Sequence, residues 1–292
     1  MNSKLWSMKV QSNGEHISWY IGPHLYFLDG NEGGGYHPIP LFSSPHVNIL
    51  EKGEDTRAYA RINTLLRLVN GLSLITRGAP IYSLKQFFYH ENQIIREIPK
   101  KHDPSLILEE LGNPFDDMVL KEIENKKFVY DNTASTDYAE LMVKDELVRE
   151  AVLLLSLSME EELYLLINAY KIYEIIRNDM QFEQQSGDKK GEAKLRKDKI
   201  TSEFSFKSFL QLEDLTGYMN NKGASGLLCR HGFSNREKKI KAPSYDEIVD
   251  IIIIAISEWM SYKSHMKFGR RYTPSKGVLD FYKRDSSWAD EW

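Results

Sequence analysis

The chain has 292 residues, of which 41% are apolar, 12% aromatic and 27% charged, and this composition excludes a largely disordered protein. A net charge of -4 excludes a uniformly basic protein that coats nucleic acid, but it leaves room for a local basic patch. The single cysteine excludes a disulfide within the chain and a cysteine-rich zinc site.

The first fifty residues alternate between short β-branched or aromatic runs and turn-forming Gly, Pro and Asn. Strands are predicted at residues 4–10, 16–21, 25–28 and 47–50. Pro38, Pro40 and Pro45 argue against a helix in the segment that contains them. Four histidines of this region match no metal-ligand spacing and are interpreted as surface or strand positions: His16, His24, His37 and His46.

Helical apolar spacing first occurs over residues 57–75 and predicts a helix that packs on the sheet. Two apolar runs on either side of the polar triplet at residues 90–92 then predict a hairpin over 81–98. A connector rich in Pro, Gly and Asn follows over 99–115. Because the chain is longer than a typical single domain, we place a domain boundary at about residue 130.

The second half of the sequence is dominated by helical apolar periodicity. Helices are predicted over residues 138–157, 160–180, 204–219 and from 244 to about 265. Ser244 and Glu247 have the spacing of a capping box at the start of the last helix. The acidic run at residues 160–162 is interpreted as the start of a helix, and the lysine-rich residues 184–199 as a solvated loop or helix extension.

These elements predict an α+β fold. Residues 1–130 would form a β-containing N-terminal domain, with a small mainly antiparallel sheet and one packed helix. Residues 131–268 would form a bundle of about four α-helices, and residues 269–292 a weakly ordered C-terminal tail with aromatic anchors. No apolar run approaches a membrane span, and no signal-peptide pattern opens the chain, so we expect a cytoplasmic protein with no membrane segment.

Residues 220–232 are the segment in which chemistry is most expected, because this polar, glycine-containing island lies between two predicted helices and ends in Arg230 and His231. A guanidinium matches phosphate geometry, and an imidazole titrates near neutral pH. The pair is therefore suited to bind or process a phosphate-bearing ligand, with Asn221 and Lys222 as further ligand contacts. The alternative is a helix exit, in which both side chains bond to last-turn carbonyls.

This arrangement resembles the HEPN family, four-helix-bundle proteins of prokaryotic toxin and defence systems that carry an arginine and a histidine near a helix start. The resemblance implies RNA cleavage without a metal or other cofactor, usually in a homodimer. His231 would act as general acid or base at the ribose 2′-hydroxyl, and Arg230 would stabilise charge on the phosphate. The family separates the two residues by several positions, whereas here they are adjacent, and only the reversed order from His231 to Arg236 has such a gap.

A second resemblance, to an uncharacterised bacterial protein family, covers residues 62–74 and 170–176 together with the island at 220–232. This resemblance implies no activity. It implies that members of the family combine a β-containing half with a helical half, as is predicted for this chain. Two basic clusters, at residues 189–199 and 267–272, are interpreted as solvated surface or as a nucleic-acid contact. Arg270 and Arg271 belong to the second cluster, which alternates cations with aromatic residues.

Two functional hypotheses follow. In the first, the protein is HEPN-like and binds RNA or another phosphate-bearing ligand, in a bacterial antiviral defence or toxin system; if it is an enzyme, it is a metal-independent ribonuclease. In the second, it is a non-catalytic interaction or scaffold protein that binds a partner subunit or a second copy of itself.

Overall fold

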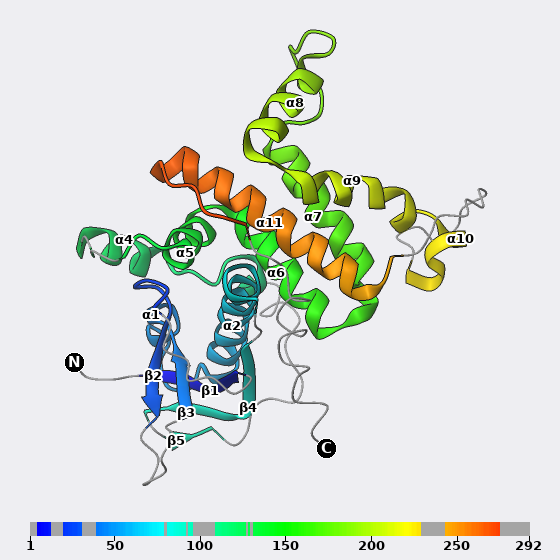
Figure 1. Ribbon diagram of the computed structural model, residues 1–292. Helices are drawn as coiled ribbons and strands as arrows, with labels where there is room; N and C mark the ends of the chain where they lie inside the picture. Colours follow the sequence, from blue (N-terminus) through cyan, green and yellow to red (C-terminus); the bar gives the residue numbers. More distant parts are fainter. Residues whose placement is uncertain are drawn as a thin grey trace, which may run out of the picture. The chain divides into compact units, whose positions relative to one another are not determined.

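The computed structural model describes residues 5–12, 20–30, 39–78, 81–91, 93–95, 109–126, 128, 131–228 and 243–274. The chain divides into two compact units (Figure 1). The first contains Met1–Ser73 and Ala79–Val143, and the second contains Leu74–Gly78 and Lys144–Trp292. The main division between the two units therefore follows Val143. The domain boundary at about residue 130 concerns independent folding and stays a prediction.

The first unit is built on a five-stranded antiparallel sheet of order β2-β3-β1-β4-β5. The strand bounds are Trp6–Ser12 (β1), Tyr26–Gly30 (β2), Ile39–Ser43 (β3), Ile81–His90 (β4) and Gln93–Ile94 (β5). Trp6, Met8 and Val10 of the central strand are fully buried, and Trp6 stacks on Phe88 of β4. The predicted hairpin over 81–98 is confirmed as β4 and β5, with Glu91 at a positive φ of 49° in the turn.

One predicted strand of this unit is wrong, because residues 47–50 overlap a short helix, α1, at Pro45–Asn48. Ser44 is its N-cap and accepts the N–H of His46, and Pro45 occupies the first turn, where the missing N–H of proline costs no hydrogen bond. Pro45 therefore begins a helix, although in the sequence it is interpreted as evidence against one. Pro40 is tolerated in β3 because it lies beyond the residues that β3 pairs with β1.

The long helix α2, Asp55–Arg77, confirms the helix predicted over 57–75. Ile62, Leu65 and Val69 of this helix are fully buried, and Tyr59 makes an edge contact with Phe88 of β4. The helix therefore shares its core with the sheet. Among the described residues, this unit also contains the helical residues 109–112, helix α4 at Asp117–Lys126 and nearly all of helix α5 at Ala134–Lys144.

The second unit is helical. The element bounds are Glu146–Glu160 (α6), Glu162–Tyr164 (η1), Leu165–Asp179 (α7), Glu192–Phe204 (α8), Lys207–Met219 (α9), Lys222–Ser225 (α10), Gly226–Leu228 (η2) and Tyr245–Phe268 (α11). Helices α6, α7, α9 and α11 pack against one another around a shared core. The predicted α+β fold class is thus confirmed, with a small antiparallel sheet in one unit and a mainly helical second unit.

Several predicted helix limits change. The helix expected over 138–157 is two helices, because Asp145 caps α6 and accepts the N–H groups of Leu147 and Val148. The acidic run at 160–162 spans the junction of two helices: Glu160 ends α6, Glu161 is extended and is the N-cap of η1, and Glu162 begins η1, which leads into α7. The lysine-rich stretch contains most of α8, which is a helix in its own right. The capping box of Ser244 and Glu247 is confirmed at the start of α11.

Of the predicted C-terminal tail, the structure describes residues 269–274, and the remainder lies outside the described residues. Gly269 ends α11 in the left-handed conformation with φ of 70°. Beyond it, the Ser261 hydroxyl donates to the Tyr272 carbonyl, and the Tyr272 N–H donates back to that hydroxyl. None of the helices within the described ranges is long and apolar enough to cross a membrane.

Candidate functional site

The island predicted as the chemical centre is described only as far as Leu228. Asn221 is buried, and its carbonyl oxygen accepts the N–H groups of Ala224 and Ser225 and the Ser225 hydroxyl. These bonds begin α10, whose first residue is Lys222. Asn221 therefore serves as a backbone junction between α9 and α10. Arg230, His231 and Arg236 lie outside the described residues, and their assigned roles stay predictions.

The basic and aromatic residues at the end of α11 are held against two phenylalanine rings. The Arg271 guanidinium carbon lies 4.8 Å from the ring centroid of Phe204, the last residue of α8. Arg270 and Lys267 lie 5.1 Å and 5.2 Å from the centroid of Phe268. A cation over a ring face is attracted by the ring quadrupole, so these contacts restrain the cations while their outer sides stay at the surface.

The other basic cluster lies on helix α8 and just before it, and two of its cations fix it to neighbouring residues. Arg196 pairs with Asp188 at 2.8 Å, and Lys197 pairs with Glu213 of α9. Four lysines of the cluster are exposed and form no ion pair with any described residue: Lys189, Lys190, Lys194 and Lys199. This segment therefore carries excess positive charge.

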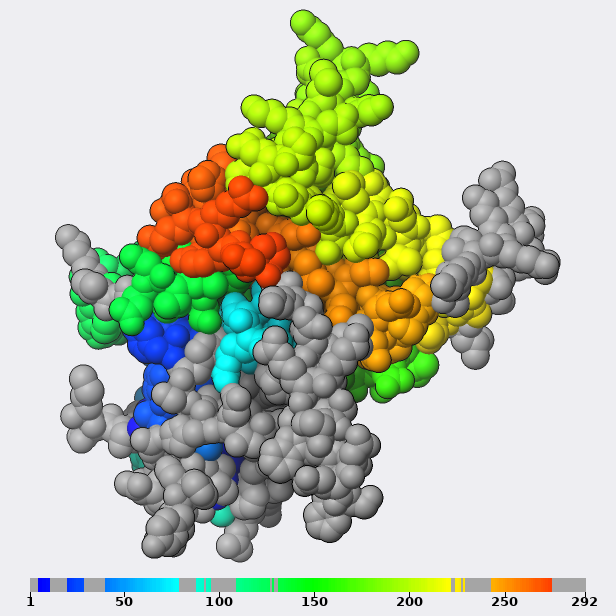
Figure 2. Space-filling model, in the orientation of Figure 1, coloured from blue at the N-terminus to red at the C-terminus, as the bar shows by residue number. Residues whose placement is uncertain are grey.

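Phe204 joins the two basic clusters. Its ring makes an edge contact with Tyr262 and a tilted contact with His265, both on α11, in addition to its contact with Arg271. The end of α8 therefore packs on the last turns of α11, and Figure 2 shows these two segments side by side on one face, yellow-green beside red. We call the exposed lysines on α8 itself, Lys194 and Lys199, together with Arg270 and Arg271 the basic-aromatic surface.

The predicted ligand contacts do not all come together. Arg271 contacts Phe204, which precedes α9, whereas Asn221 and Lys222 follow the opposite end of α9 (Figure 1). The 13 residues of α9 separate the two places by about 20 Å at the helical rise of 1.5 Å per residue. The structure thus places the last turn of α8 beside Arg271 and leaves Asn221 and Lys222 at the other end of α9.

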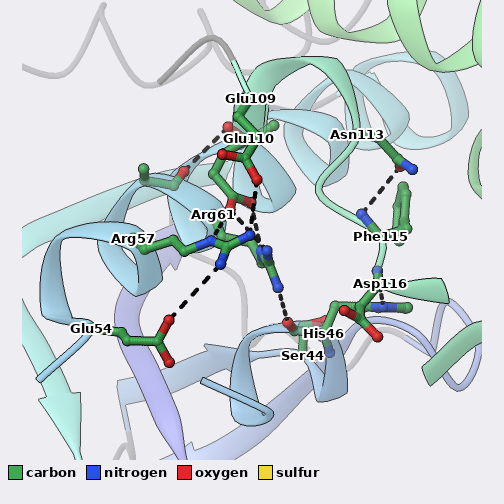
Figure 3. A network of polar contacts seen from close by, with 12 residues as sticks. Ser44, His46, Glu54, Arg57, Arg61, Glu109, Glu110, Asn113, Phe115 and Asp116 are labelled. Carbon is green, nitrogen blue, oxygen red and sulfur yellow. Dashed lines mark hydrogen bonds and ion pairs between the residues drawn. The ribbon is translucent and has the colours of Figure 1, made fainter. Parts of the chain in front are cut away.

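The first unit contains a polar network that the sequence patterns do not predict (Figure 3). The Glu110 carboxylate, which is 1% exposed, receives Arg61 Nε at 2.5 Å, Arg61 Nη2 at 2.8 Å and Arg57 Nε at 2.9 Å. Arg61 Nη1 also donates to the backbone carbonyl of His46 at 2.9 Å. The network therefore links α2 to α1 and to the helical residues 109–112.

His24 and His46 correct the interpretation of the N-terminal histidines as surface or strand positions, because both are buried and face each other. His24 Nδ1 lies 2.9 Å from His46 Nε2, and the Asp116 N–H donates to His46 Nδ1 at 2.9 Å. The pKa of His46 is lowered to about 3. Burial is the largest cause, followed by the neighbouring His24 and Arg61. The residues are 22 positions apart, so no local spacing could have indicated the pair.

Within the described ranges, no group of three or more His, Cys, Asp or Glu side chains is placed to hold a metal ion. Comparison with protein-family models, curated proteins and solved structures finds no match to this chain. Functional inference therefore rests on the residues themselves, and the basic-aromatic surface is the candidate site that the geometry supports best.

Proposed function

We propose that this protein binds single-stranded RNA through the basic-aromatic surface, as a HEPN-like protein of a bacterial defence or toxin system. The observation that supports RNA binding is the packing of Phe204 against α11, which brings the end of the basic helix α8 beside Arg271. Neither basic cluster by itself would indicate RNA binding, because short runs of charged residues are common on solvated helices.

The chemistry of the surface suits a single strand. Exposed lysines contact phosphates as point charges, and they track a backbone without reading its sequence. The Arg271 guanidinium lies over the Phe204 ring, and a guanidinium restrained in this way can stack with an unpaired base on its other side. The combination predicts binding with little sequence preference and with strong dependence on salt.

Binding is tested by fluorescence anisotropy with a labelled single-stranded RNA of mixed sequence. We expect Lys194→Glu combined with Lys199→Glu to weaken binding at least tenfold at low salt, because both lysines are exposed on α8. The matched control combines Lys121→Glu with Lys126→Glu, at two exposed positions of α4 in the other unit, and changes the net charge by the same amount. Equal weakening by the control would indicate a nonspecific charge effect and would reject the proposed surface.

Cleavage is a separate part of the proposal and rests on the resemblance of Arg230 and His231 to the HEPN pair. His231 would exchange a proton with the ribose 2′-hydroxyl, and Arg230 would stabilise the charged phosphate. The test compares wild type with His231→Ala on labelled RNA in the presence of a chelator. Loss of cleavage in the variant with retained binding supports the assignment, whereas equal cleavage by both proteins rejects it.

A second candidate function is association with a partner subunit or a second copy of the chain. The specific observation is that Leu163 and Tyr164, adjacent residues of η1, are 62% and 55% exposed. Neighbouring exposed apolar side chains are typical of contact surfaces. Light scattering over a concentration series is the test: a dimer in wild type that is lost in Leu163→Ser supports association through η1, and an unchanged mass rejects it.

A further inference from the structure

The His24–His46 pair of the first unit is a buried contact between two titratable groups. His46 is 0% exposed and His24 is 6% exposed. Their rings are nearly parallel, with an interplanar angle of 14° and centroids 5.2 Å apart. Phe115 makes an edge contact with both rings and is itself buried. The pair is thus enclosed between α1, the residues that precede β2, and the segment that leads into α4.

The hydrogen bonds fix where the protons lie. The Asp116 N–H can only donate, so His46 Nδ1 must accept and carries no proton. A neutral imidazole then holds its proton on Nε2, which donates to His24 Nδ1. This series of hydrogen bonds cannot accommodate an added proton on either imidazole. A proton on His46 Nδ1 would face the Asp116 N–H, and a proton on His24 Nδ1 would face the His46 N–H.

The charged groups around the pair do not offset an added positive charge. Arg61, from α2, places a guanidinium on the His46 carbonyl. The Glu110 carboxylate is already bonded to Arg61 and Arg57. Asp116 directs its carboxylate Oδ1 to the N–H groups of Met118 and Val119, where it caps α4. The nearest cation therefore opposes protonation, and these two carboxylates are occupied.

We propose that the His24–His46 pair is an acid-sensitive latch, which holds residues 115–116 against α1 at neutral pH and releases them when either imidazole takes up a proton. Protonation breaks the bond from Asp116 N–H to His46 Nδ1 or the bond between the two rings. Because Asp116 also caps α4, release of this residue exposes Phe115 and frees the start of that helix. The latch does not depend on RNA binding.

The direction of the pH effect follows from the lowered pKa of His46. The open segment binds one more proton than the closed one wherever the pH lies between the ordinary histidine value and the lowered one. The latch is therefore fully closed above about pH 6.5, and its opening constant rises about tenfold for each pH unit below that. Between neutral pH and pH 5 the expected increase is about thirtyfold.

The test is amide hydrogen exchange of the intact protein from pH 8 to pH 5, with each rate expressed relative to an unstructured peptide of the same sequence at the same pH. We expect protection of the peptide that contains Asp116 to fall about thirtyfold in wild type and to stay constant in His46→Asn, where the amide oxygen accepts the Asp116 N–H without titrating. His90→Asn, at another buried histidine of the same unit, is the control and should behave as wild type.

Three results would overturn the latch. One is a protection of the Asp116 peptide that falls with decreasing pH as steeply in His46→Asn as in wild type. Another is an equal loss of protection in the amides that pair β1 with β4, which would indicate unfolding of the whole unit. The third needs no variant: imidazole nitrogen shifts of wild-type His46 that titrate near pH 6.5 while the Asp116 amide stays protected.

Discussion

Glu258 on α11 caps the first turn of α9, because both of its carboxylate oxygens lie 3.1 Å from the backbone nitrogen of Ser208. Oε2 also accepts the N–H of Phe209 at 3.1 Å. The N-cap residue of α9 is Phe206, whose side chain has no hydrogen-bond acceptor. A side chain 50 positions along the chain therefore supplies the cap and joins α9 to α11.

Replacement of Glu258 tests this cap. Glu258→Ala leaves buried N–H groups without an acceptor, so we expect the free energy of unfolding to fall by about 2 kcal/mol. Glu258→Gln keeps one acceptor oxygen, so its free energy of unfolding should fall by less. Urea unfolding measures both, with Glu150→Gln at an exposed position of α6 as control. An effect of Glu258→Ala no larger than that of the control would contradict the role of Glu258.

Glu258 also predicts a pH dependence. Burial raises the pKa of its carboxyl, although the backbone N–H groups of Ser208, Phe209 and Lys207 act in the opposite direction. A raised pKa means that the folded protein binds this proton more tightly than the unfolded chain. This contribution to stability is therefore present below the ordinary value of 4.5 and is lost as the pH rises through the folded pKa. Unfolding curves of wild type and Glu258→Gln should differ in slope across that window.

Lys263 on α11 is predicted to hold two acidic residues together. Its Nζ lies 2.7 Å from Asp145 Oδ2 and 2.8 Å from Asp179 Oδ2, and Trp259 Nε1 donates to the same Asp179 oxygen. Lys263→Met leaves two partly buried carboxylates without this cation, so we expect a loss of about 2 kcal/mol. Asp179→Asn in the same background should restore part of that loss. A purely additive double variant in thermal unfolding would show that the charges are not coupled.

Arg57 and Arg61 offer a matched comparison within one network. The Arg61 side chain is 6% exposed and that of Arg57 is 35% exposed, and both bond to Glu110. We expect Arg61→Met to lower the free energy of unfolding by about 3 kcal/mol or more, because it leaves a buried carboxylate with one of its three arginine bonds. Arg57→Met should cost about 1 kcal/mol or less, since exposed pairs contribute little. Equal losses in urea unfolding would contradict the dependence on burial.

Arg271 connects the proposed function to a single contact. Arg271→Lys keeps the charge but removes the planar guanidinium that lies over the Phe204 ring. If the guanidinium stacks with a base, we expect RNA affinity to fall about threefold to tenfold while the salt dependence stays the same. Anisotropy titrations at several salt concentrations measure both quantities. An RNA affinity and a salt slope that both stay at the wild-type values would show that Arg271 acts as a charge alone.

The candidate site was only partly predictable. The sequence indicated both basic clusters, and Arg270 and Arg271 were selected from the second. It did not indicate that Phe204 brings the clusters together, because Phe204 was placed at the start of the following helix and not at the end of α8. Asn221 and Lys222 are close to Arg230 in the sequence, but the length of α9 separates them from the other basic residues.

The sequence by itself determined the elements whose signals are local. Ser244 and Glu247 lie three residues apart and fix the start of α11 through their own backbone bonds, and the polar turn at Glu91 fixes the β4–β5 hairpin. Only the tertiary structure decided that Glu258 caps α9 and that His24 faces His46. These contacts join residues far apart in the chain, and their energies depend on burial, which a linear pattern does not contain.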